Sequence, residues 1–374
     1  MFTRRRVYSD LRLDRPCIFL PATRPGEAST TVTGKLSLYL PQNVSIQKIH
    51  VKLKGILKIP CQEYFSKSFQ GALTFEQTQV LATSKKSGSF QLSAGKYEFP
   101  FEFCLERGMG ESLMGPGHQY HAYEVCGVIT RQFGGDSVIT TPLQIYYTPS
   151  QFMDDLWGLS PVSIDNYWEG RVHYNISIPN RDIPFGSIFP VNLWFVPLSK
   201  SITLKTITIE VEEQHILRIT PSAADSIRYN SAFFRAKRNH IIFREVYGVE
   251  DYVTTESDIS DVEWSTTKSV HLPQDLKACT QRVDLDEIKV SHSLKIIIEM
   301  QDTDGRIPKI IGCIPFNIYM SPQNILENGD VYQRDLREPQ DDKTMTPPLY
   351  GDHLGDCRIP DHSSDPQTVF MIAQ

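Results

Sequence analysis

The stretch Lys48-Ile49-His50-Val51-Lys52-Leu53-Lys54 places an aliphatic residue at every second position and a basic residue between. Successive side chains of a β-strand point to opposite faces, so this period of two predicts a strand with one face in a core. The same alternation returns far along the chain, in Leu294-Lys295-Ile296-Ile297-Ile298-Glu299-Met300. Short strands of this kind, separated by turn residues such as Pro41-Gln42-Asn43, indicate antiparallel β-sandwiches.

A run of aromatic residues predicts the core of the first sandwich. Tyr97, Phe99, Phe101 and Phe103 share one face of a strand that Pro100 interrupts. We expect this aromatic face to point inward. No segment of ten or more residues carries a convincing helical stripe, so the predicted fold is all-β, with less than about 15% helix against a usual third.

The chain has 374 residues, which favours two domains over one. Periodic strands fill 1–147 and 160–320, and we predict that these are two immunoglobulin-like β-sandwich domains. Residues 148–159 contain Pro149 and Gly158 and predict a linker. The periodicity stops after 320, so 321–374, rich in proline and acidic residues, is predicted to be a disordered tail.

Charge and composition exclude several classes of protein. Residues 321–374 hold ten acidic and four basic residues, which accounts for the whole net charge of −6 and leaves 1–320 neutral. A neutral body with an acidic tail argues against nucleic-acid binding. The seven cysteines include no CxxC pair, which disfavours zinc ribbons and a disulfide framework. The apolar runs are too short to span a bilayer and no signal peptide is evident, so we expect a cytosolic protein.

No catalytic signature emerges from the sequence. There is no GxSxG, GxxxxGK[ST], HExxH or kinase motif. His118 and His121 flank Tyr120, but no further ligand lies at metal-binding spacing beside them, so exposed or hydrogen-bonded histidines at a strand end are the favoured interpretation. We therefore expect no enzyme activity, no cofactor and no metal.

A basic strand face is the first candidate binding surface. Lys48, His50, Lys52 and Lys54 lie opposite the inward-facing Ile49, Val51 and Leu53. One interpretation is an ordinary solvated face, and the other is a surface for acidic phospholipids or an acidic partner segment. Farther along, residues 249–268 are acidic and rich in serine and threonine, which predicts a long exposed loop whose role the sequence leaves open.

The sharpest motif lies in the tail, at Thr346-Pro347-Pro348-Leu349-Tyr350. A Pro-Pro pair favours an extended left-handed helix that is ordered at little entropic cost. WW domains bind such segments in aromatic grooves, and the tyrosine ring of a PPxY motif fills a second pocket. Pro347, Pro348, Leu349 and Tyr350 are therefore predicted to bind a WW domain.

Several further segments, in order along 11–360, resemble the fungal α-arrestins, the arrestin-related trafficking adaptors. The matching segments are Arg12-Leu13-Asp14-Arg15-Pro16, Ala94-Gly95-Lys96-Tyr97-Glu98-Phe99-Pro100-Phe101, Tyr167-Trp168-Glu169-Gly170-Arg171-Val172, Ser291-His292-Ser293-Leu294-Lys295-Ile296 and Pro347-Pro348-Leu349-Tyr350-Gly351-Asp352-His353.

This resemblance implies an arrestin fold of two β-sandwiches and the function of an adaptor. Such an adaptor brings a WW-containing HECT ubiquitin ligase to plasma-membrane transporters, which are then ubiquitinated, endocytosed and degraded. It implies a cytoplasmic protein that is recruited to the plasma membrane and endosomes and is itself ubiquitinated. Many family members carry two or more PPxY motifs, whereas this sequence has one, which reduces any gain from avidity.

Two other classes of function stay open at this point. A retromer-like arrestin scaffold would sort cargo without a ubiquitin ligase, and Tyr350 would then have no role. A β-sandwich enzyme or carbohydrate-binding domain would need a polar cluster beside aromatic platforms, which the predicted strands do not supply.

Overall fold

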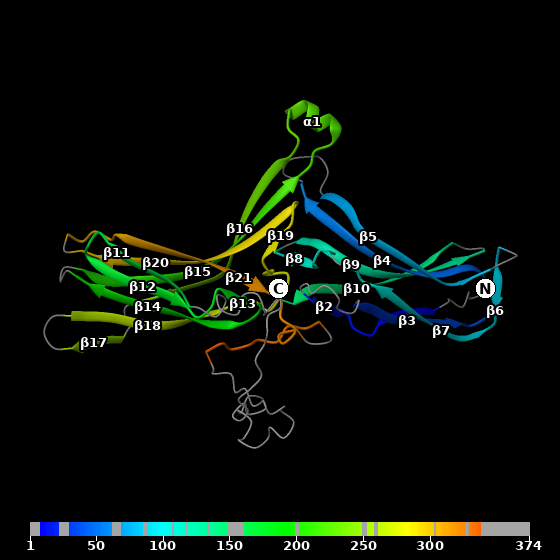
Figure 1. Ribbon diagram of the computed structural model, residues 1–374, viewed down its shortest axis with the longest axis horizontal. Coiled ribbons are helices and arrows are strands. Elements are labelled where there is room, and N and C mark those ends of the chain that lie inside the picture. Colours follow the sequence, from blue (N-terminus) through cyan, green and yellow to red (C-terminus); the bar gives the residue numbers. More distant parts are fainter. Residues whose placement is uncertain are drawn as a thin grey trace, which may run out of the picture. The chain divides into compact units, whose positions relative to one another are not determined.

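A computed structural model describes most of the chain (Figure 1). The described residues are 8–21, 30–61, 69–84, 88–106, 108–116, 118–132, 135–148, 161–198, 202–248, 253–257, 261–302, 304–325 and 329–337. Strands dominate these ranges, and the only helix among them has seven residues. The all-β fold predicted from the sequence is therefore confirmed.

The N-terminal sandwich consists of two sheets. One has the strand order β1 (Tyr8–Leu13), β3 (Thr31–Leu40) and β7 (Gly95–Cys104). The other has the order β2 (Cys17–Pro21), β10 (Ser137–Thr148), β9 (His118–Arg131), β4 (Val44–Pro60) and β5 (Phe69–Thr83), with β6 (Phe90–Leu92) paired to β4 and β8 (Leu113–Gly115) paired to β9.

The facing sides of these two sheets share one hydrophobic core. Ile49, Val51 and Leu53 of β4 are buried in it, as their alternation predicted. Phe101 and Phe103 of β7 are also buried there, and Phe99 packs against the same cluster, so the predicted direction of the aromatic face is correct. Pro100 does not break the strand, because β7 lies at the edge of its sheet, where a missing N–H removes no bond to a further strand.

The C-terminal sandwich also has two sheets. One has the order β11 (Val162–Trp168), β12 (Val172–Ile178), β14 (Ile188–Pro197), β18 (Asp261–His271) and β17 (Val253–Ser257). The other has the order β13 (Asp182–Pro184), β21 (Lys309–Tyr319), β20 (Ile288–Gln301), β15 (Thr203–Ile219) and β16 (Phe234–Tyr247), with β19 (Val283–Asp284) paired to β20. Helix α1 (Ala223–Tyr229) connects β15 to β16.

Two features of this architecture differ from the sequence-based expectations. Most strand pairs are antiparallel, but β2 pairs with β10, and β13 with β21, in parallel. The region 249–268 is not a long exposed loop, because it contains β17 and most of β18. Trp264 and Val270 of β18 are buried in the core, and their even spacing in the chain was obscured by the hydroxyl and lysine residues between them.

The predicted disorder of 321–374 is wrong for the residues that the structure describes, 321–325 and 329–337. Asn324 is buried, and its side-chain amide donates to the carbonyl of Phe185 and to the hydroxyl of Ser187. Ile325 joins the core of the C-terminal sandwich, and Asp335 forms an isolated bridge with Ile188. The predicted linker, apart from Thr148, lies outside the described residues, so the domain boundaries stay predictions.

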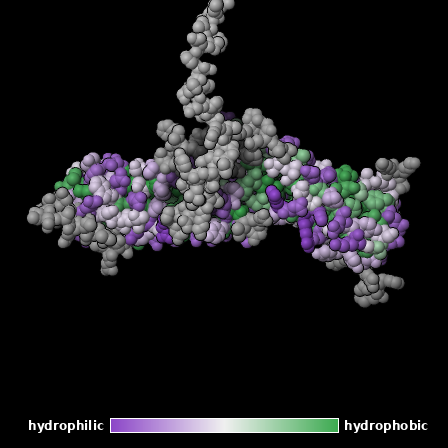
Figure 2. Space-filling view, turned by 60° about the horizontal axis from the view of Figure 1, so that its bottom comes forward, coloured by the Kyte–Doolittle hydropathy of each residue, from purple (hydrophilic) through white to green (hydrophobic). Residues whose placement is uncertain are grey.

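A third hydrophobic cluster contains residues of both sandwiches. Its members are Leu57, Ile59, Cys61, Leu113 and Tyr120 from the first, and Leu217, Ile219, Ala236, Val283, Ile288 and Val290 from the second. The two sandwiches therefore share an apolar contact. Elsewhere, hydrophilic and hydrophobic residues are interspersed over the visible described surface, as expected for half-exposed strands (Figure 2).

Candidate functional site

The strongest sequence motif cannot be placed in the structure. Pro347, Pro348, Leu349 and Tyr350 lie outside the described residues. Their assignment as a WW-binding segment stays a prediction from the sequence.

The basic face of β4 is present but is less exposed than its sequence suggests. β4 lies between β5 and β9, so its outward side chains stand among those of both neighbours. Lys48, Lys52 and Lys54 are half-buried, and His50 is only 7% exposed. Burial, followed by the charges of Lys48 and Lys52, lowers the pKa of His50. The imidazole therefore adds no positive charge to this face at neutral pH.

Acidic residues offset much of the remaining charge on this face. The Nζ atom of Lys52 lies 3.3 Å from Oε1 of Glu76 on β5. Lys54 pairs across the sheet with both Glu76 and Glu124, and cross-strand partners share a face. Three lysines and two glutamates leave a local charge of about +1, so this face offers a modest attraction for acidic groups.

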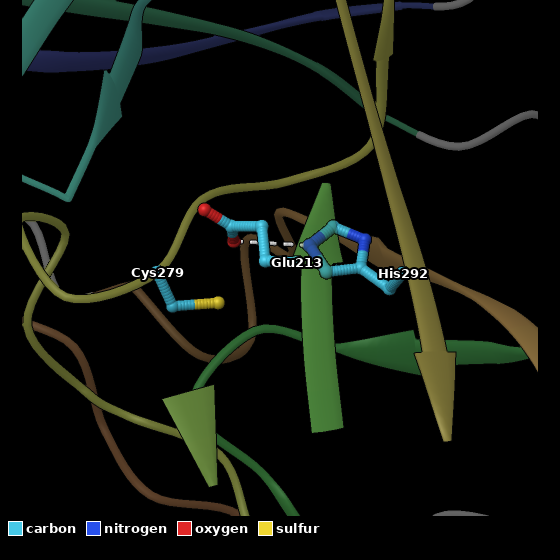
Figure 3. Close-up of side chains that lie close together, drawn as sticks. All are labelled: Glu213, Cys279 and His292. Carbon is cyan, nitrogen blue, oxygen red and sulfur yellow. Dashed lines mark hydrogen bonds and ion pairs between the residues drawn. The ribbon is translucent and has the colours of Figure 1, made fainter. Parts of the chain in front are cut away.

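The structure reveals a second candidate site, a buried polar cluster on the C-terminal sandwich. Glu213 and His215 project from β15, His292 from β20, and Cys279 from the segment before β19, and none of the four is exposed by more than 3%. One carboxylate oxygen of Glu213 lies 2.6 Å from Nε2 of His215. The other accepts from Nε2 of His292 at 3.1 Å and from the backbone N–H of Thr280 at 2.8 Å. Figure 3 shows Glu213, Cys279 and His292 converging.

These hydrogen bonds decide the ionisation of the cluster. Burial alone would raise the pKa of Glu213, but hydrogen bonds from His215 and His292, together with the charge of these imidazoles, lower it to about 2. Burial raises the pKa of the Cys279 thiol well above its usual value, and the nearby Glu213 carboxylate adds to that effect. At neutral pH the cluster therefore contains an ionised carboxylate beside a protonated thiol.

The same residues form the one group of possible metal ligands within the described ranges. The ligand atoms of Glu213, Cys279 and His292 lie within 4.8 Å of one another. A zinc ion would require the Cys279 thiolate and a lone pair on His292 Nε2. Here Nε2 of His292 bonds to the carboxylate of Glu213, so a metal ion at this place would have to replace that hydrogen bond.

The network extends to the N-terminal sandwich. The hydroxyl of Tyr120, on β9, lies 2.9 Å from Nδ1 of His215. The side-chain amide of Gln281 donates to the carbonyl of Ser112 at 2.9 Å. Each bond joins the two sandwiches across more than 90 residues of sequence. The cluster is therefore suited to fixing how the sandwiches pack rather than to chemistry on a substrate.

Sequence reasoning missed this cluster, although a signal was present. Along β15 the buried positions alternate through Val211, Glu213, His215 and Leu217, which puts two polar residues in an inward-facing series. His292 occupies the corresponding inward position between Val290 and Leu294 on β20. Polar residues at core-facing strand positions predict buried hydrogen-bond partners. Cys279, outside any strand, gave no comparable signal.

Known proteins resemble this chain both in one domain and over nearly its whole length. Residues 168–323 match the family model of the arrestin (or S-antigen) C-terminal domain. The chain is 29% identical over 386 residues to the "Probable HECT-type ubiquitin ligase-interacting protein creD" of Aspergillus clavatus. It is 28% identical over 386 residues to the "HECT-type ubiquitin ligase-interacting protein creD" of Emericella nidulans. Each alignment covers 97% of this chain and 63% of the relative.

The described part of the chain is thus all-β, and residues 168–323 of it resemble an arrestin C-terminal domain. More particularly, the chain is similar over 97% of its length to the fungal creD proteins, in keeping with the resemblance noted from its sequence. It spans 63% of the length of these two curated relatives.

Proposed function

We propose that this protein is an adaptor, not an enzyme, that recruits a WW-domain HECT-type ubiquitin ligase to membrane transporters. The observation that carries the proposal is the similarity, over 97% of the chain, to proteins named for their interaction with a HECT-type ubiquitin ligase. The sequence supplies a matching ligand, because Pro347, Pro348, Leu349 and Tyr350 form a PPxY motif of the kind that WW domains bind.

The transporter and membrane parts of this proposal rest on the α-arrestin resemblance. The adaptor would work from the cytoplasm, at the plasma membrane and endosomes, and the bound cargo would be ubiquitinated, endocytosed and degraded. The adaptor itself would carry ubiquitin as a modification. Its tail motif would engage the ligase, while the sandwiches would engage the cytosolic tails of transporters.

The basic face of β4 suits an acidic peptide better than a lipid surface. Its lysines are half-buried among strand neighbours, and a flat bilayer cannot reach recessed charges closely, whereas an extended peptide can lie along them. Lys48, His50, Lys52 and Lys54 are therefore proposed as a contact for acidic segments of transporter tails. Because the local charge is only about +1, this contact contributes selectivity and association rate more than affinity.

The ligase proposal is tested by binding the full chain to an isolated WW domain. Wild-type protein should bind with micromolar affinity, about −8 kcal/mol. Tyr350→Ala removes the ring that fills the second pocket and should weaken binding by at least about 2 kcal/mol, in the range of an interface hot spot.

A matched control is Tyr332→Ala, because Tyr332 is an exposed tyrosine of the C-terminal segment outside the motif. The control should bind as the wild type does. In a reconstituted reaction with a WW-HECT ligase, Tyr350→Ala should also lose its ubiquitination. Equal ubiquitination of both variants would instead favour a retromer-like scaffold that sorts cargo without the ligase.

A further inference from the structure

The connection between β15 and β16 contains a helix, α1, whose side chains are not buried against the rest of the protein. α1 has seven residues, none of them buried, and it stands beyond the paired ends of the two strands (Figure 1). An isolated helix of this length is unstable in water. It is fixed by its caps, since the Ser222 hydroxyl accepts from the N–H of Asp225 and Asn230 ends the helix in the left-handed conformation. The capping residues Ser222 and Asn230 thus stabilise one conformation of this exposed tip.

The tip displays apolar side chains to solvent. Ile227 is 83% exposed, Tyr229 49% and Phe233 36%. Single exposed apolar residues are ordinary, but three within seven positions at the end of a strand pair form a local apolar tip. None of them belongs to a hydrophobic core cluster of the described residues.

Arginines surround this apolar tip. The guanidinium of Arg218 lies 4.7 Å from the centre of the Phe233 ring, and that of Arg235 lies 5.5 Å from it. The guanidinium of Arg228 lies 5.4 Å from the centre of the Tyr229 ring. Residues 218–237 contain four basic residues (Arg218, Arg228, Arg235 and Lys237) and one acidic residue (Asp225), so their net charge is 4 − 1 = +3. The net positive charge of this segment is therefore larger than that of the basic face of β4, where two glutamates offset three lysines.

We propose that the α1 tip is a membrane-contact element that binds the surface of a bilayer containing anionic phospholipids. Ile227 and Tyr229 would enter the boundary between headgroups and acyl chains, while the arginines stay level with the phosphates. A convex tip with a few apolar side chains inside a basic ring matches such a surface in both polarity and charge. A protein partner would need a pocket shaped to this tip, whereas a fluid interface needs none.

This inference deepens the proposed function, because it rests on an adaptor that acts at membranes and names the lipid surface as a partner of α1. The lipid contact of α1 and the recruitment of a ligase can be refuted separately. Vesicle binding requires no ligase, and WW-domain binding requires no lipid, so one assay can fail while the other succeeds.

The test is sedimentation of the purified full chain with vesicles. The probes are vesicles of phosphatidylcholine alone and of equal parts phosphatidylcholine and phosphatidylserine. The wild type should bind the mixed vesicles and not the neutral ones, and salt should weaken that binding. Ile227→Ser and the double variant Arg228→Glu with Arg235→Glu should each weaken binding to the mixed vesicles, the double variant by at least about tenfold. Because Ile227 and Arg228 lie on α1, which buries no residue, and Arg235 is exposed on β16, both variants should melt as the wild type does.

The controls carry the same chemical changes on the N-terminal sandwich. Val138→Ser removes an exposed aliphatic side chain, and Lys35→Glu with Lys96→Glu reverses two exposed charges. Both controls should bind mixed vesicles as the wild type does. The proposal is overturned if the wild type ignores the mixed vesicles, if the tip variants bind normally, or if the controls lose binding equally.

A fluorescence measurement tests separately whether the side chain at position 227 enters the bilayer. Ile227→Trp places an indole at the most exposed apolar position of the tip. Brominated lipids in the mixed vesicles should quench the fluorescence of this variant more than that of the wild type. Equal quenching of the two proteins would mean that Ile227 does not enter the bilayer, and it would refute the membrane-contact assignment.

Discussion

Replacing Glu213 by glutamine should destabilise the C-terminal sandwich strongly while preserving side-chain volume. One carboxylate oxygen faces the N–H of Thr280 and Nε2 of His292, and the other faces Nε2 of His215. A backbone N–H cannot accept a hydrogen bond, so the amide of the variant must turn its oxygen toward Thr280. Its NH₂ group then faces Nε2 of His215, which must give up its proton or lose its partner.

Two routes give the size of this effect. Removing one partner of a buried ionic cluster typically destabilises a protein by about 3–5 kcal/mol. Separately, a carboxyl with a pKa of 4.5 in the unfolded chain and about 2 in the folded chain contributes about 3 kcal/mol to stability at neutral pH. The two figures agree, and about 3 kcal/mol lowers the melting temperature of a domain of this size by about 6–12 °C.

The pH dependence gives a sharper test than the melting temperature alone. Because the pKa of Glu213 is lower in the folded state, its contribution is complete above about pH 4.5 and is lost as the pH falls toward 2. Urea titrations of the wild type should therefore show a loss of stability over this range that Glu213→Gln lacks. Glu212→Gln, the same change at a neighbouring half-buried position on the other face of β15, should melt like the wild type. If Glu213→Gln and Glu212→Gln had the same stability and pH profile, the reasoning would be refuted.

Three further outcomes follow from packing and charge. Phe101→Ala empties a buried site in the first core and should lower stability by about 3–5 kcal/mol in urea titration; an unchanged midpoint would contradict the burial of this ring. Asn324→Ala leaves the carbonyl of Phe185 without its amide donor and should lower stability by about 1–3 kcal/mol, whereas no change would show that 321–325 is not anchored there. Lys52→Glu with Lys54→Glu should weaken binding of an acidic transporter-tail peptide about tenfold at low salt, and a full-strength complex measured by calorimetry would remove β4 from the cargo contact.

The strands could be predicted because their signal is local. Ile49, Val51 and Leu53 alternate with lysines, and a two-residue period needs no knowledge of what lies across the sheet. Residues 249–268 were misjudged for the same reason. β18 joins its neighbours through Trp264 and Val270, but threonine, serine and lysine occupy the positions between them, so no aliphatic alternation marks the strand. Their burial depends on β14 and β17, which the local pattern does not reveal.

Composition misled the prediction for residues 321–337. Acidic and proline-rich sequence usually fails to bury enough apolar surface to fold alone. Here Ile325 and Asn324 pack on a domain that already has a core. Ile325 joins the apolar core of the C-terminal sandwich, and Asn324 donates to the carbonyl of Phe185. A segment that packs on an existing domain does not have to form a core of its own, and composition does not register this difference.

The polar cluster restricts the relative orientation of the two sandwiches more strongly than the apolar cluster does. An apolar cluster such as the one that contains Leu57 and Leu217 can form in many relative orientations, because hydrophobic attraction has no direction. Hydrogen bonds are directional, and a buried donor that loses its acceptor destabilises the fold, so the bond between Tyr120 and His215 is satisfied in few orientations. The polar side chains on the inner strand faces thus select one packing of the two sandwiches from those that the apolar cluster allows. Because Tyr120 and His215 stand 95 residues apart, no local pattern in the sequence identifies them as partners, and only the folded chain does.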